Sequence, residues 1–175
     1  MFEVGKNVVF GSHGICRVED IGTGIEFGMP KNMERSKLVY YKLSPLFVTA
    51  YSVIYTPVEN TEHLREAICG EEAERYLKGL TSAEVQVFAD NSQGRLKEHY
   101  KELTAMEEPK AYLRIIKEVS KKRRDAMIRH KRLGQVDEVY LKKAEELVCR
   151  EFAAALNTTP ELVKNRIYEE IKNSL

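Results

Sequence analysis

The sequence predicts an α+β protein of two modules, a small β-barrel followed by an all-α helical bundle. Short runs rich in β-branched and aromatic residues are confined to residues 1–60, and such runs are typical of short strands. Residues 61–175 instead carry apolar side chains at helical spacing. Because the strands come first and the helices follow, we expect two juxtaposed modules that divide between residues 60 and 61.

The first module is expected to form a strongly bent barrel, because several short strands fall within about 60 residues. A turn with two glycines, Gly11 and Gly14, lets the chain reverse tightly after the first strand. The stretch 22–36, rich in Gly, Pro, Asn and charge, predicts a long, mobile hairpin tip. We expect strands over residues 8–10, 15–21, 38–43 and 51–56. We expect a core of Val8, Phe10, Val18, Ile21, Leu43 and Ile54.

Punctuating residues divide the second module into helices. Gly79 should end the first helix, because glycine is favoured just past a helix end. Pro109 suits the first position of a later helix, where its missing N–H has no partner to lose. Residues 158–161, Thr-Thr-Pro-Glu, form a capping signature for the last helix. We expect helices over 71–79 and 95–105, from Pro109 onward, after Gly134, and a last helix that the 158–161 signature opens, with Glu161 three residues after Thr158.

A net charge of +1 hides one strongly basic segment. Residues 110–134 contain ten lysines and arginines against two acidic residues, whereas residues 61–109 carry a net charge of −5. Lys117, Lys121 and Arg124 are spaced to share one helical face. Such a face either contacts phosphates or is solvated and balanced by a neighbouring helix, and the charge pattern leaves both readings open. The candidate balancing carboxylates are Glu145, Glu146 and Glu151.

No set of residues in the sequence predicts catalysis or a cofactor. It has no phosphate-binding glycine loop, and its four histidines never pair at helical spacing with a second metal ligand. Cys16, Cys69 and Cys149 are far apart and odd in number, which argues against a disulfide framework and favours a reducing compartment. The sequence has no membrane-length apolar run and no secretory signal. We therefore expect a cytoplasmic, non-enzymatic protein that uses no metal, cofactor or small-molecule substrate.

Short motifs along nearly the whole chain share one order and spacing. The opening motifs are Phe2-x-Val4-Gly5-x-x-Val8-Val9-Phe10, Gly11-x-His13-Gly14 and Val18-Glu19-x-Ile21. The motif Tyr55-Thr56-Pro57-Val58-Glu59-Asn60 ends the first module. The helical motifs are Tyr112-Leu113-Arg114-Ile115-Ile116-Lys117 and Tyr140-Leu141-Lys142-Lys143-Ala144-Glu145. In these motifs the chain resembles the CarD/CdnL family of bacterial RNA polymerase-binding transcription regulators, in its clostridia-like version.

The resemblance implies a fold and two partners. The first module would be a Tudor/SH3-like barrel that docks on the β subunit of RNA polymerase. The second would contact promoter DNA at the upstream edge of the melted region, weakly without polymerase. Family members commonly insert a Trp there as a wedge, which offsets part of the unstacking cost. This sequence has no Trp, and the wedge position falls at Ser92 or near Phe88. The alternative is therefore a polymerase-binding adaptor that does not engage DNA.

Site residues follow from these two roles. A barrel commonly recruits an extended partner along an exposed strand edge. Candidates for the polymerase contact are Tyr41, Val53 and Tyr55, and each has ordinary cross-strand packing as its alternative. Candidates for the DNA contact are Phe88, Ser92, Arg95, Lys97, Lys121 and Arg124. Phe88 is either an exposed wedge or a core residue, and we favour the core.

Overall fold

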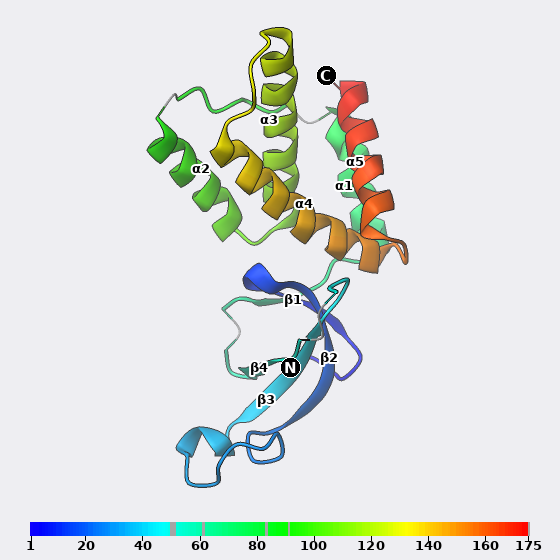
Figure 1. The fold of residues 1–175 in the computed structure, drawn as a ribbon. Coiled ribbons are helices and arrows are strands. Elements are labelled where there is room, and N and C mark those ends of the chain that lie inside the picture. The colour runs from blue at the N-terminus through cyan, green and yellow to red at the C-terminus, as the bar shows by residue number, and fades with distance from the viewer. Residues whose placement is uncertain (50–51, 61, 83, 91, 175) are drawn as a thin grey trace. The chain divides into compact units, whose positions relative to one another are not determined.

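A computed structural model describes all residues except 50, 51, 61, 83, 91 and 175 (Figure 1). The chain forms two compact units, Met1–Ala67 and Ile68–Leu175. The division lies between residues 67 and 68 rather than between 60 and 61. The reason is a strand missed in the sequence, Leu64–Glu66, which pairs with the first strand and so belongs to the first unit.

The first unit is an antiparallel five-stranded sheet in the order β4-β3-β2-β1-β5. Its strands are β1 Asn7–Phe10, β2 Gly14–Thr23, β3 Val39–Pro45, β4 Ile54–Pro57 and β5 Leu64–Glu66. Over the described residues the sheet is open, with β4 and β5 at its two edges. Closure into a Tudor/SH3-like barrel thus stays a prediction. Tyr51, the first residue of the expected last strand, lies outside the described residues.

The predicted core of this unit is confirmed. Val8, Val18 and Leu43 are fully buried. Phe10, Ile21 and Ile54 pack half-buried against them. The expected tight reversal is also present, because Gly11 has a φ of 44° and Gly14 a φ of 73°, in the region that glycine adopts without strain.

The segment between β2 and β3 is a loop with several internal hydrogen bonds, and its mobility stays a prediction. The Gly24 N–H donates to the Leu38 carbonyl at 3.1 Å, and the Met29 N–H donates to the Gly24 carbonyl at 2.8 Å. Ser36 is buried, and its hydroxyl donates to the Met33 carbonyl. A Cβ at Gly24 would lie 2.9 Å from the Ser36 Cα, so this close approach requires glycine.

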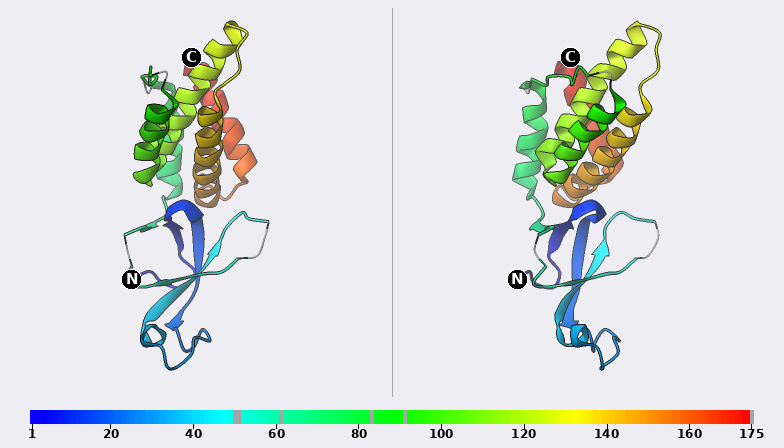
Figure 2. Two further views of the ribbon diagram at one scale, coloured as in Figure 1. Left: turned by 60° about the vertical axis from the view of Figure 1, so that its left-hand side comes forward. Right: turned by 90° about the vertical axis from the view of Figure 1, so that its left-hand side faces the viewer.

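The second unit contains five helices over the described residues (Figure 2). They are α1 Gly70–Ser82, α2 Gln93–Ala105, α3 Pro109–Ile128, α4 Gln135–Ala155 and α5 Pro160–Ser174. The predicted starts at Pro109 and after Gly134 are confirmed. The prediction that Gly79 ends the first helix is wrong. Leu80, which lies beyond it, is buried, and that burial outweighs the roughly 1 kcal/mol cost of a helical glycine.

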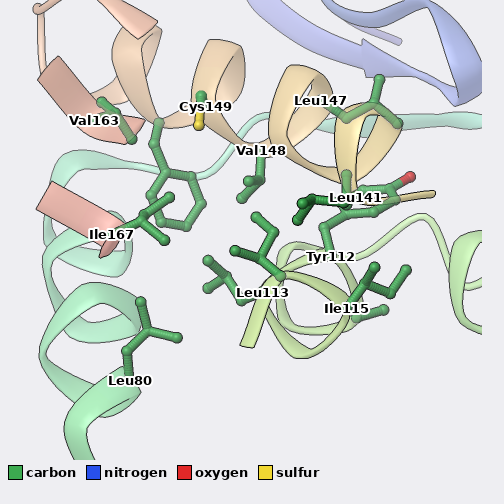
Figure 3. Close-up of a cluster of buried hydrophobic side chains, with 14 of the residues drawn as sticks. Leu80, Tyr112, Leu113, Ile115, Leu141, Leu147, Val148, Cys149, Val163 and Ile167 are labelled. Carbon is green, nitrogen blue, oxygen red and sulfur yellow. The ribbon is translucent and has the colours of Figure 1, made fainter. Parts of the chain in front are cut away.

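Side chains from α1, α3, α4 and α5 meet in one apolar core (Figure 3). Leu113 of α3 and Val148 of α4 lie near its centre, and Ile167 of α5 closes one side (Figure 3). The last helix begins within the predicted signature, but its capping side chain is Thr159 rather than Thr158, since the Thr159 hydroxyl oxygen accepts from the Leu162 N–H at 3.4 Å. In the part of the chain that the structure describes, no helix has both the length and the apolar character to cross a membrane.

Candidate functional site

The edge strand β4 is the first candidate surface. Its pairing partner in the sheet is β3, so its outer edge presents backbone groups that an incoming strand can pair with. Tyr55 lies on this strand, opposite Lys42 of β3, and is 42% exposed. Its ring packs against the ring of Phe27 at 5.1 Å between centroids. The β2–β3 loop, through Phe27, therefore supports the tyrosine at the edge.

The three predicted polymerase contacts lie in different settings. Tyr41 is on β3, which is paired on both sides, and it is buried. Its hydroxyl oxygen accepts from the Phe2 N–H at 2.8 Å. The expectation that Tyr41 lies near the sheet edge is therefore wrong, because the strand after it covers that edge. Val53 is half-buried just before β4, and Tyr55 lies on the edge strand itself.

In the helical unit, a buried carboxylate on α3 organises the segment between α1 and α2. Glu118 is fully buried. Its Oε1 accepts from the Phe88 backbone N–H at 3.1 Å, and its Oε2 lies 3.0 Å from His99 Nε2. A buried carboxylate is stable only with such partners. These contacts hold the chain before α2 against α3.

Lys122 lies one turn after Glu118 and completes a paired network. Its Nζ lies 3.4 Å from Glu118 Oε1 and 3.0 Å from Asp137 Oδ1 of α4. The Tyr100 hydroxyl donates to the same Asp137 oxygen at 2.7 Å and accepts from Lys122 Nζ at 3.0 Å. Burial, and then the bond to Asp137, raise the pKa of Tyr100, so it remains a donor. We call Glu118, Lys122, Asp137, Tyr100 and His99 the carboxylate network.

Phe88 is part of the wall around this network. It is half-buried, and its ring stacks on His99 with centroids 4.5 Å apart and planes 11° from parallel. The residue is therefore neither a freely displayed wedge nor a fully buried core residue. Close by in sequence, Arg95 pairs with Asp90 at 2.9 Å while remaining 77% exposed. Arg95 therefore already has a local carboxylate partner.

A second face of α3 carries cations in a different environment. Lys110, Arg114, Lys117 and Lys121 line two adjoining clefts of about 790 and 540 Å³. Lys117 is buried, and its Nζ donates to the Leu80 carbonyl in the last turn of α1. Burial lowers the pKa of Lys117, and the helix C-terminus favours a cation there. Sequence reasoning missed Lys110 and Arg114, although their spacing continues the face that Lys117 and Lys121 begin.

The predicted DNA contacts on α2 and α3 lie in different settings. Lys121 shares a cleft with Lys117. Arg124 is exposed one turn farther along α3, with a 3.9 Å contact to Asp125. Ser92 and Lys97 are exposed at the start of α2 and within it. The structure thus places the predicted cations on α2 and on α3 in separate groups.

The carboxylates considered as balancing charges have partners outside the basic segment 110–134. Glu145 pairs with Lys164 at 2.8 Å, and Glu146 pairs with Arg150 at 2.6 Å. One Glu151 oxygen accepts from the Ile68 N–H at 3.3 Å. These contacts draw the three carboxylates into packing within α4 and toward α5 and the start of the unit. They leave the cations on the cleft side of α3 available for an external anion.

Titratable groups elsewhere do not converge on a reactive centre. Burial raises the pKa of Cys16 to about 12, and burial followed by the charge of Glu145 raises that of Cys149 to about 12. Both remain thiols near neutral pH. Over the residues described, no three His, Cys, Asp or Glu side chains gather as metal ligands would. The arrangement is suited to binding through a strand edge and through charge.

Comparison with known families gives one match. Residues 2–68 match the family model described as the CarD-like/TRCF RID domain. The matched segment covers the whole five-stranded unit and ends where the helical unit begins. The curated proteins gave no match to the chain.

Proposed function

We propose that this chain is a transcription regulator that binds the polymerase β subunit through its first unit, because residues 2–68 match the family model of the CarD-like/TRCF RID domain. Through its second unit it contacts promoter DNA near the upstream edge of the transcription bubble. The observation that carries the polymerase role is the family match, which covers the unit with the open β4 edge. The DNA role depends on the cations of the helical unit.

Strand order supports a Tudor/SH3-like interpretation of the first unit. Strands β1 to β4 form an antiparallel meander, and β5 returns to pair with β1. Bending such a sheet brings its two edge strands toward one another, as in small barrels. In the proposed complex a strand of the β subunit adds to β4, and Tyr55 provides an exposed aromatic side chain beside the added backbone.

The proposed DNA contact uses cations that tertiary packing leaves accessible. Over the described residues, neither Lys97 nor Lys121 has an ion-pair partner. Proximity to polymerase supplies the effective concentration that a weak phosphate contact lacks in isolation. The proposed surface comprises Phe88, Ser92, Arg95, Lys97, Lys121 and Arg124.

Two observations favour the alternative, an adaptor that binds polymerase without engaging DNA. Arg95 is already paired with Asp90. Lys122, in the middle of the basic run, is already paired with the acidic side chains Glu118 and Asp137 of the carboxylate network.

Salt dependence of DNA affinity separates the two functions, because phosphate contacts release counterions. If the chain contacts phosphates, the affinity of the full chain for forked promoter DNA should fall steeply as the salt concentration rises. A flat, weak response would favour the adaptor.

The polymerase role is tested with the substitution Tyr55→Arg in the full chain. We expect at least about tenfold weaker binding to the isolated β-subunit lobe, because a bulky cation replaces the aromatic contact beside the added strand. The matched control is Val4→Arg, since Val4 is also an exposed apolar residue of the first unit but lies outside β4. Unchanged binding by Tyr55→Arg, with an unchanged melting temperature, would contradict docking at β4.

A further inference from the structure

The two clefts beside α3 are parts of one groove. Both are lined by Lys117 and by residues 84–86, which follow α1. One extends toward Arg75 and Tyr76 of α1, and the other extends toward Lys121 and Ser174. We call their combined lining the cationic groove. It is separate from the carboxylate network, whose α3 members Glu118 and Lys122 line neither cleft.

Positive charge dominates this groove. Its cations are Arg75, Lys110, Arg114, Lys117 and Lys121, and Glu84 is the carboxylate among the lining residues described. Arg75 has a loose contact with Glu72 at 3.6 Å that is open to solvent and therefore weak. Over the described part of the chain, Lys110, Arg114 and Lys121 have no ion-pair partner. The groove thus has unneutralised charge suited to phosphates.

The length of the charged row indicates a chain of phosphates. Lys110, Arg114 and Lys121 recur at i, i+4 and i+11, which spans about 16 Å at the helical rise of 1.5 Å per residue. Lys117 lies between them, but its ammonium donates to the Leu80 carbonyl, so it adds charge to the groove without contacting a phosphate. A single bound phosphate would engage only one end of such a row. A strand that carries a phosphate on every nucleotide can engage several of the cations in turn.

The volume and the walls of the groove favour one strand over two. Its parts, about 790 and 540 Å³, have the size of sites that hold small molecules, and they admit nucleotide units but not a double helix. Tyr76 and Val85, which are half-buried, line the larger part and offer apolar surface to unpaired bases. Positive grooves with apolar or aromatic walls are the usual way of holding single strands.

We propose that the cationic groove binds single-stranded DNA, with phosphates along α3 and bases against Tyr76 and Val85. The inference rests on the proposed function and deepens it, because it names the form of DNA and the face that holds it. In an open promoter the groove would hold a melted strand. It would therefore stabilise the melted state by binding that strand more tightly than duplex.

The experiment measures fluorescence anisotropy of the full chain without polymerase, at about 50 mM salt. The probes are labelled oligo-thymidine of about 12 nucleotides and a duplex of equal length. ATP is added as a competitor. We expect oligo-thymidine to bind at least about tenfold more tightly than the duplex. Arg114→Glu and Lys121→Glu should each weaken it by about tenfold. Lys142→Glu, an exposed lysine of α4 outside the groove, should change it less than about twofold.

Three outcomes would overturn the inference. The first is that the duplex binds as tightly as the single strand, and the second is that the groove variants bind like wild type. The third is that ATP displaces the oligonucleotide with the affinity expected of a small-ligand site. Melting temperatures of all variants are measured, so that unfolding is not mistaken for lost contact. Failure here leaves the proposed function intact if Tyr55→Arg still weakens binding to the polymerase lobe by at least about tenfold. A proposed function that fails leaves the oligonucleotide result unchanged.

Discussion

Two faces of the same helix use positive charge in opposite ways. On one face of α3, Lys122 lies among Glu118, Asp137 and Tyr100 and neutralises buried carboxylates. On the other, Lys121 and Arg114 line an open groove in which cations outnumber carboxylates. Adjacent residues in a run of four cations therefore have unrelated roles. A run of charged residues therefore indicates a function only once it is known which helix face each residue occupies and which side chains pack against that face.

The sharpest test of this contrast compares two adjacent lysines. Lys122→Met removes the cation shared by two buried carboxylates, and we expect it to lower the free energy of unfolding by about 3–5 kcal/mol. Lys121→Met should change the same quantity by less than about 0.5 kcal/mol, because that side chain has no ion-pair partner over the described residues. Urea denaturation of both variants measures the difference.

Equal losses from Lys121→Met and Lys122→Met would contradict the division of α3 into two faces. A loss from Lys122→Met alone would support it, and oligonucleotide binding then provides the complementary readout. There the ranking should reverse, with Lys121→Met weakening binding and folded Lys122→Met leaving it nearly unchanged.

Much of the fold follows from the sequence because local signals are strong there. Gly11 and Gly14 have the positive φ that a tight reversal needs, and Pro109 begins α3 as its missing N–H predicts. β5 was missed because it is three residues long and gains its stability from pairing with β1. A strand held by partners distant in sequence carries little local pattern.

The candidate site was less accessible to sequence reasoning, for the same physical reason. Tyr41 is an aromatic residue of a type found at sheet edges. However, β4 pairs with the outer side of its strand, β3, and Tyr41 is buried. The partners of Lys122 come from α2 and α4 as well as from its own helix. Helical spacing does predict which cations share a face, and extending it back from Lys117 to Arg114 and Lys110 would have found the groove.

An intermediate effect is expected at Phe88, which borders the carboxylate network. Phe88→Ala removes the stacking on His99 from a half-buried position, and we expect a loss of about 1–2 kcal/mol of unfolding free energy. The backbone bond to Glu118 remains, so the variant should stay folded. Met106→Ala, an exposed residue at the end of α2, is the control.

Open-complex lifetime on a promoter, measured with the same Phe88→Ala variant, completes this test. If Phe88 acts as a wedge, the lifetime shortens while unfolding free energy is nearly unchanged. If Phe88 instead packs against the carboxylate network, the unfolding free energy falls, and the open-complex lifetime shortens only because less of the protein is folded. A fully stable variant with a short-lived open complex would contradict the packing role that the stacking on His99 indicates.

The smallest expected effect concerns Arg95 of α2. This cation is paired, as Lys122 is, but exposed to solvent. Its bond to Asp90 at 2.9 Å is open to solvent, so its net contribution to stability is about 0–1 kcal/mol. To reach a phosphate, Arg95 must leave that carboxylate. Asp90→Asn keeps an oxygen for the Ser92 N–H, which Asp90 accepts at 2.8 Å, but it weakens the hold on Arg95. We expect affinity for forked DNA to rise about twofold to threefold at low salt and the gain to vanish at high salt.

Asp125→Asn is the control, because it removes an equal charge beside Arg124. If both variants raise affinity equally, the gain reflects net charge, and Arg95 makes no specific contact. If Asp90→Asn raises affinity and the further change Arg95→Ala abolishes the gain, Arg95 contacts DNA once its carboxylate partner is neutralised.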